Sequence, residues 1–164
     1  LLTGAFGFVR ADAFKMQSAA IIMQMLGCIS AGLLADRFGA GKVMLVGSAS
    51  VALVASIFYN SLGHADTSTI FMLYMLLGLC SGTVGMVSYS MVKMFPAQIR
   101  FTGISFSYNL AYAIAGGITL PLVQWLSAFS PIGALYYVWV VCMVAFFTAM
   151  LYRAKFEKAN FRPS

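Results

Sequence analysis

No charged residue occurs between Phe101 and Tyr152, where the sequence reads FTGISFSYNLAYAIAGGITLPLVQWLSAFSPIGALYYVWVVCMVAFFTAMLY. A helix needs about 20 apolar residues to cross a bilayer, so this stretch is too long for one span and long enough for two. A segment rich in Ser, Pro and Gly at 127–133 supplies the break between them. Because the stretch lacks the alternation of transmembrane strands, we predict two membrane helices at 103–126 and 134–152.

The rest of the chain has the same apolar character. Over the full sequence of 164 residues, 62% are hydrophobic and 9% are charged, against about 25% charged in ordinary soluble domains. This composition excludes a soluble globular domain and a disordered chain. Three further apolar runs predict membrane spans at 16–35, 43–62 and 69–92. The net charge of +6 does not gather on one face, so we expect no nucleic-acid partner.

The two ends of the chain and its basic residues indicate the topology. Residues 1–9 are apolar but too short to span, and without a basic flank they are not a signal peptide. We interpret them as the stub of a helix whose start is missing. Lys15 is expected to extend to the outer interface or to face a cavity. The other basic loops, and a tail at 153–164, should be cytoplasmic by the positive-inside rule; their residues are Arg37, Lys42, Lys93, Arg100, Arg153, Lys155, Lys158 and Arg162.

A charged motif, GLLADRFGAGK at 32–42, joins the first two predicted spans. Gly32 would let two helices approach closely. Asp36 ends one helix near basic residues and near the next helix N-terminus, where a negative charge is favoured. Gly39 and Gly41 permit a tight turn. A charged hairpin without any further role would look the same. The basic members of the motif, which mark the cytoplasmic face, are Arg37 and Lys42.

This motif resembles the loop signature of the major facilitator superfamily, Gly-x-Leu-Ala-Asp-Arg-x-Gly followed by basic residues. The familiar form has two basic residues after the last Gly, whereas this chain has Ala40-Gly41-Lys42, so its copy is weakened. The position of the motif, after a stub and one full span, corresponds to helices 8 and 9 of the superfamily. The resemblance therefore implies a C-terminal six-helix half of that fold with its first helix truncated.

A second motif, FPAQIRFTG at 95–103, lies between the third and fourth predicted spans. It resembles the metabolite–proton symporter branch of the superfamily, whose members show Phe-Pro-x-x-x-Arg-x-x-Gly, a Tyr-Asn pair and a Gly-Gly step. Here Arg100 occupies the basic position, and the pair and the step are Tyr108-Asn109 and Gly116-Gly117. The branch includes proline/betaine, shikimate, citrate and 2-oxoglutarate carriers.

The resemblance implies a secondary active transporter of the bacterial cytoplasmic membrane with a cytoplasmic C-terminus. It would move a small zwitterion or an organic acid with protons by alternating access, in partnership with a missing N-terminal six-helix half. The loops around Asp36 and Arg100 would close the cytoplasmic face. No cofactor and no metal are expected.

Polar residues inside spans are candidates for solute contact. Ser105, Asn109 and Gly116 share a helix face that could line a cavity or pack on a neighbour. Gly78, Gly82 and Gly85 form a small-residue stripe that indicates close packing or a bend, and the pair Gly116 and Gly117 is a further packing candidate. By the superfamily's architecture, the residues expected to line the cavity are Gln24, Tyr89, Tyr108 and Asn109.

No Asp or Glu lies inside a predicted span, although proton coupling usually needs an intramembrane acid or His. We therefore expect the coupling carboxylate in the missing half. The isolated cysteines and the single loop His64 offer neither a metal site nor an enzyme's nucleophile and base, so no enzyme is predicted. The alternative to a transporter is a non-transporting membrane anchor or assembly subunit. The three cysteines are Cys28, Cys80 and Cys142.

Overall fold

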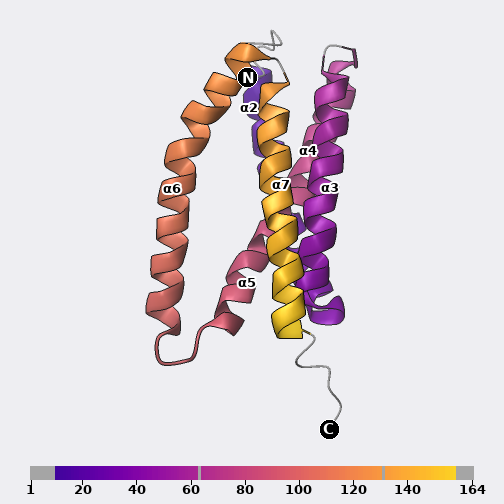
Figure 1. Cartoon of the computed structure of the whole chain (residues 1–164). Coiled ribbons are helices and arrows are strands. Elements are labelled where there is room, and N and C mark those ends of the chain that lie inside the picture. Colours follow the sequence, from indigo (N-terminus) through magenta and orange to yellow (C-terminus); the bar gives the residue numbers. More distant parts are fainter. Residues whose placement is uncertain (1–9, 63, 131, 158–164) are drawn as a thin grey trace.

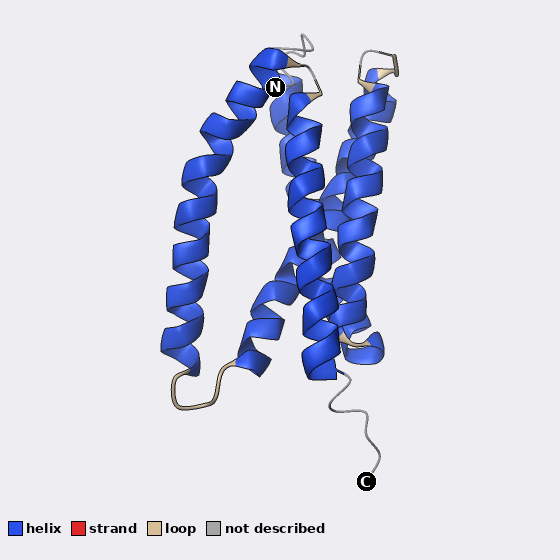
Figure 2. Ribbon diagram, in the orientation of Figure 1, coloured by secondary structure: helices blue, strands red, loops and turns tan. Residues whose placement is uncertain are grey.

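The computed structural model describes residues 10–157 except 63 and 131, and all regular structure in this part of the chain is helical (Figure 1 and Figure 2). A 3-10 turn, η1, joins α4 to α5, and a π-helical turn, η2, follows α7. The predicted stub at 1–9 lies outside the described residues. The elements are α2 (Arg10–Phe38), α3 (Ala40–Ser61), α4 (Thr67–Ser81), η1 (Gly82–Val84), α5 (Gly85–Met94), α6 (Arg100–Phe129), α7 (Gly133–Tyr152) and η2 (Arg153–Glu157).

Five of these helical stretches are long and apolar enough to cross a membrane, counting α4, η1 and α5 as one. The prediction of an all-helical integral membrane protein is therefore confirmed. The helices extend beyond the predicted spans at several ends, because apolarity marks only the part in hydrocarbon. The α2 helix begins at Arg10. In its first turns the Lys15 ammonium lies 3.1 Å from the Asp12 carboxylate, an exposed pair that a helix supports outside the lipid core.

Helices α2 and α4 approach each other through glycines. A β-carbon at Gly78 would collide with the carbonyl oxygen of Ala20, and one at Gly82 would collide with the backbone of Gly27. Conversely, a β-carbon at Gly27 would collide with the carbonyl oxygen of Leu79. Such backbone contacts are possible only where both surfaces are small, and in membranes they provide much of the attraction between helices.

The third span changes its helical geometry at η1, and Figure 1 shows α5 leaving the line of α4 at this point. The turn is wedged between two neighbours: Gly82 lies against α2, and a β-carbon at Gly47 of α3 would lie 2.6 Å from the Thr83 hydroxyl oxygen. At Gly85, where α5 begins, a β-carbon would lie 3.5 Å from the Cys28 sulfur, an ordinary van der Waals distance. The glycine stripe thus includes both a close helix contact and a bend.

Helices α3 and α7 form the second pair, with an apolar groove of about 520 Å³ between them. The Trp139 indole donates a hydrogen bond of 2.9 Å to the Ser56 hydroxyl, which in turn donates to the carbonyl oxygen of Ala52. Cys142 is buried beside the groove. The groove contains none of the residues predicted to bind solute.

Replacing Trp139 with Phe removes the indole donor that joins α7 to α3. We expect the free energy of unfolding to fall by about 0.5–1.5 kcal/mol, the usual range for a single hydrogen bond between membrane helices. Trp125→Phe is the matched control, because the Trp125 ring packs on Phe129 and no hydrogen bond to its indole occurs among the described residues. Denaturant unfolding in detergent micelles measures both variants. Equal losses would mean that ring volume and not the hydrogen bond is responsible.

Helix α6 lies apart from the other helices over most of its length, as Figure 1 shows. None of its residues is buried within the described structure. Its link to α7 is the hydroxyl pair of Thr119 and Tyr137, 2.6 Å apart. The two helices then turn sharply, since a β-carbon at Gly133 would collide with the carbonyl oxygen of Leu126. A whole membrane helix is thus left with an open surface.

Candidate solute site and charged motifs

Two of the predicted cavity residues, Tyr108 and Asn109, lie side by side on the open α6 helix. The Asn109 amide nitrogen donates to the carbonyl oxygen of Ser105 at 2.8 Å, one turn earlier. The Tyr108 hydroxyl donates to the Tyr112 hydroxyl at 3.1 Å, one turn later. Asn109 and Ser105 also border a shallow hollow on the helix surface. The arrangement presents uncharged hydrogen-bonding groups on a helix that crosses the membrane.

Tyr112 was not among the predicted site residues, although it belongs to this group. Its ring stacks on that of Tyr108 with centroids 4.5 Å apart and planes inclined by 29°. The signal was present in the sequence, because residues four apart lie on the same face of a helix. Tyr112 is 56% exposed, so much of this residue is accessible.

The other two cavity candidates, Gln24 and Tyr89, are not brought to this group. Gln24 is half-buried on α2, and α2 makes no contact with α6 within the described residues. Tyr89 lies on α5 near the end that carries the charged loops, with the Lys93 ammonium 4.4 Å from its ring centroid. A different amide on α2, that of Gln17, contacts α4. The Tyr74 hydroxyl donates to the Gln17 side-chain oxygen at 2.6 Å.

The α2–α3 motif forms a hairpin with a single connecting residue, Gly39. Its φ of 94° and ψ of 142° lie in a region that only glycine adopts readily. Asp36 and Arg37 lie in the last turn of α2, and Lys42 lies in the first turn of α3. Gly41 is helical and buried, so the tight turn depends on Gly39. Gly32 has no atom near the place of a β-carbon, so no close helix contact occurs there in the described structure.

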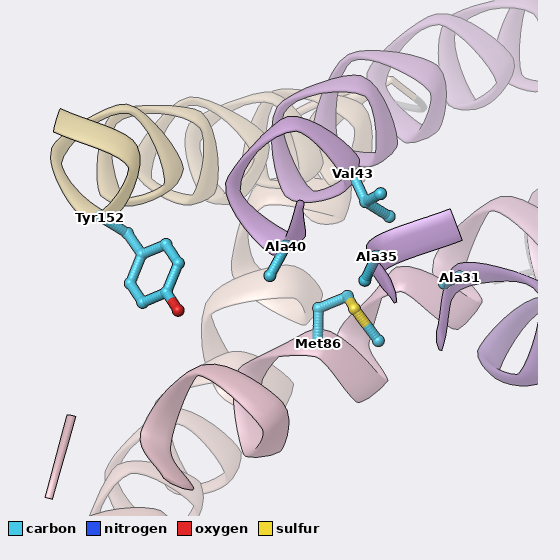
Figure 3. Close-up of a cluster of buried hydrophobic side chains, with 6 residues drawn as sticks. All are labelled: Ala31, Ala35, Ala40, Val43, Met86 and Tyr152. Carbon is cyan, nitrogen blue, oxygen red and sulfur yellow. The ribbon is translucent and has the colours of Figure 1, made fainter. Parts of the chain in front are cut away.

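Small apolar side chains support this hairpin from inside the bundle, as Figure 3 shows. Met86 of α5 lies between the end of α2 and the start of α3, and Tyr152 reaches the same cluster from α7. The Ser90 hydroxyl adds a contact of 3.5 Å to the sulfur of Met44. The cluster holds four helices together beneath the charged residues. Its buried members are Ala31, Ala35, Ala40, Val43, Met86 and Tyr152.

Above this cluster, the Asp36 carboxylate is exposed and forms no ion pair within the described residues. The Lys93 ammonium of α5 nevertheless lies within its electrostatic range. Arg37 points elsewhere, with its guanidinium carbon 5.5 Å from the Phe38 ring centroid. The charges of α2 and α5 are thus near enough to attract each other without direct contact.

The second motif closes on itself as a local turn between α5 and α6. The Arg100 guanidinium donates to the carbonyl oxygen of Phe95 at 3.2 Å, which satisfies an acceptor just after the end of α5. The Phe95 ring lies directly on Gly103, where a β-carbon would be 2.6 Å from the ring. The contacts within this turn therefore account for the presence of Phe95, Arg100 and Gly103 at their spacing in the motif. Gly116 and Gly117 have no neighbouring atom at the place of a β-carbon in the described structure.

Curated proteins with similar sequences are membrane transporters. The chain is 33% identical over 106 residues to the inner membrane metabolite transport protein YhjE of Escherichia coli (strain K12), which covers 63% of this chain and 24% of that protein. It is 30% identical over 132 residues to the proline/betaine transporter of the same strain, covering 79% and 26%. It is 26% identical, with the same coverage, to the glycine betaine/proline/ectoine/pipecolic acid transporter OusA of Dickeya dadantii (strain 3937).

The chain spans about a quarter of the length of these curated relatives. No family model matches it. No solved structure matches it significantly. The five described helices that can cross a membrane agree with the membrane location that the relatives' names indicate.

Proposed function

We propose that this chain forms part of a proton-coupled symporter. It is a relative of the proline/betaine and metabolite transporters, and its motifs resemble those of the major facilitator superfamily. The solute is a small zwitterion or an organic acid, and transport proceeds by alternating access. The location is the bacterial cytoplasmic membrane, with the C-terminus in the cytoplasm. The relatives are named for betaine, proline, ectoine, pipecolic acid and metabolites, which are solutes of this kind.

The observation that carries the proposal is the surface of α6. A helix that crosses a bilayer usually buries its polar groups against other helices or around a water-filled cavity. Here Tyr108 and Asn109 lie within the apolar stretch, and none of the described α6 residues is buried. We assign them to the wall of the solute pathway. Gln24 and Tyr89 remain proposals for other parts of the same pathway.

The second half of the pathway and the proton-binding carboxylate are proposed to come from outside this chain. All four acids of the sequence lie at helix ends or in loops, at Asp12, Asp36, Asp66 and Glu157. None is placed where an intramembrane proton site requires it. A native polypeptide that contains no membrane-embedded carboxylate outside this chain would contradict proton coupling.

The decisive experiment uses the native protein that contains this sequence, reconstituted in vesicles. Labelled glycine betaine, proline and a dicarboxylate are offered separately, with and without an imposed pH gradient. We expect saturable uptake of at least one of them, with a faster initial rate when the outside is acidic, because protons then enter with the solute. A protonophore should remove the stimulation. Absence of saturable uptake would favour the anchor or assembly subunit instead.

A further inference from the structure

The stacked pair Tyr108–Tyr112 lies at a depth where tyrosine is unusual. At 1.5 Å per residue, the two positions are about 12 and 18 Å from the start of the helix, which is about 45 Å long. With a hydrocarbon core of about 30 Å centred on the helix, both lie inside it. Tyrosines normally gather at the interfaces, where Trp125 and Phe129 of the same helix are found.

The hydroxyls of this pair are only partly satisfied. Tyr108 donates to Tyr112, so the hydrogen of the Tyr112 hydroxyl is left for another acceptor. No acceptor for it occurs among the described residues. A polar hydrogen exposed to lipid is costly, so the position favours water or a ligand over hydrocarbon.

The face that carries the pair turns toward α7. Positions 108, 112 and 119 are separated by nearly whole helical turns, so they lie on one face. Thr119 contacts Tyr137 of α7, which fixes the direction of that face. The pair therefore lies on the side of α6 that looks back at the bundle, where α6 itself remains unburied.

The electrostatics of this surface select the ligand. From Phe101 to Tyr152 the chain carries no charged side chain, so neither α6 nor α7 offers a carboxylate to a cation bound there. The tyrosine rings instead present their negative faces to a cation, and such faces attract ammonium groups, quaternary ones in particular. A primary or secondary ammonium also needs acceptors for its N–H groups, which ring faces do not supply well. A fully methylated ammonium has no such requirement.

We propose that the Tyr108–Tyr112 pair binds the quaternary ammonium end of a small zwitterion on its free ring faces, with the Tyr112 hydroxyl donating to the ligand carboxylate. This inference rests on the proposed function and narrows it to fully methylated zwitterions. Both ends of the ligand are then satisfied by uncharged groups. Among zwitterions of equal net charge, the site discriminates by the methylation of the ammonium group.

The test measures uptake by the native protein in vesicles. Labelled glycine betaine is the probe, and glycine, sarcosine, dimethylglycine and tert-butylacetate compete; the last replaces the nitrogen by carbon and has no positive charge. Tyr112→Leu removes the ring, and Tyr112→Phe removes only the hydroxyl. Trp125→Leu is the matched control, because it deletes an aromatic ring elsewhere on α6. The amount of each variant in the membrane is measured in parallel.

For the unchanged protein we expect competition to strengthen with each added methyl group, and tert-butylacetate to compete poorly. Tyr112→Leu should raise the KM for glycine betaine about 2- to 30-fold and flatten the methyl series, the range expected for a lost cation–π contact. Tyr112→Phe should weaken binding while keeping the methyl preference. Trp125→Leu should change neither quantity.

Each opposite outcome has a distinct meaning. Uptake of proline or a carboxylate without any methyl preference would overturn this inference and leave the proposed function standing. A methyl preference that survives Tyr112→Leu at normal protein amount would also overturn it. Absence of saturable uptake of every solute in the unchanged protein would overturn the proposed function, and this inference with it.

Discussion

Replacing Gly82 with Ala is expected to lower the free energy of unfolding by about 1–3 kcal/mol, the cost of inserting a methyl group into a filled contact. The new β-carbon would collide with the backbone of Gly27 and Cys28, so α2 must separate from the η1 turn that ends α4. No flexible side chain can move aside, because the colliding atoms belong to a helix backbone. Unfolding by denaturant in detergent micelles, followed by tryptophan fluorescence, measures the loss.

Gly32→Ala is the matched control for this experiment. It introduces the same methyl group into a helix, at a position with no neighbouring atom in the described structure. Alanine is the better helix former by up to about 1 kcal/mol, so this variant should be as stable as the original or more so. If the two substitutions shifted stability in the same direction and by similar amounts, the close α2–α4 contact would not be the cause.

Replacing Asp36 with Asn is expected to slow solute transport by the native protein about 2- to 5-fold, as a charge of this kind at an exposed helix end contributes about 0.3–1 kcal/mol. The substitution removes a negative charge that attracts Lys93 of α5 and lies next to the start of α3. Under the proposed alternating-access mechanism, a contribution of this size shifts the balance between the open and closed states of the face that carries the charged loops. Initial uptake rates in vesicles, corrected for protein amount, measure the effect.

Asp66→Asn serves as the control, since it removes the same charge from an exposed loop residue before α4, at the other end of the helices. It should leave transport unchanged. Normal transport by the Asp36 variant at equal membrane amount would contradict a role of this charge in gating.

Much of the fold could be predicted from the sequence, because apolar length is a direct physical requirement of crossing a bilayer. The five spans and the helical class follow from it. The kinship to proline/betaine and metabolite transporters was predicted from two short motifs and is confirmed by the relatives. Exact helix ends were not predictable, since an exposed pair such as Asp12 and Lys15 continues a helix without any apolar signal.

The arrangement of the candidate site was less predictable. The sequence places Tyr108 and Asn109 on a helix, but it does not say that α6 is left uncovered while α2 and α4 meet backbone to backbone. That outcome depends on which glycines face a partner: Gly78 and Gly82 do, and Gly116 does not in this chain. Residue type alone cannot separate these cases, because a small residue permits a close contact without requiring one.

The sparse contacts of α6 have a consequence for how the protein is made. Of the five spanning helices, α6 is the least apolar, so it partitions into the bilayer least readily when it leaves the ribosome. No described residue of α6 is buried against other helices either. Its firm attachment is to α7, which is the most apolar of the five and follows directly after a tight turn. Biogenesis would therefore favour insertion of the two as a hairpin, in which the later helix retains the earlier one.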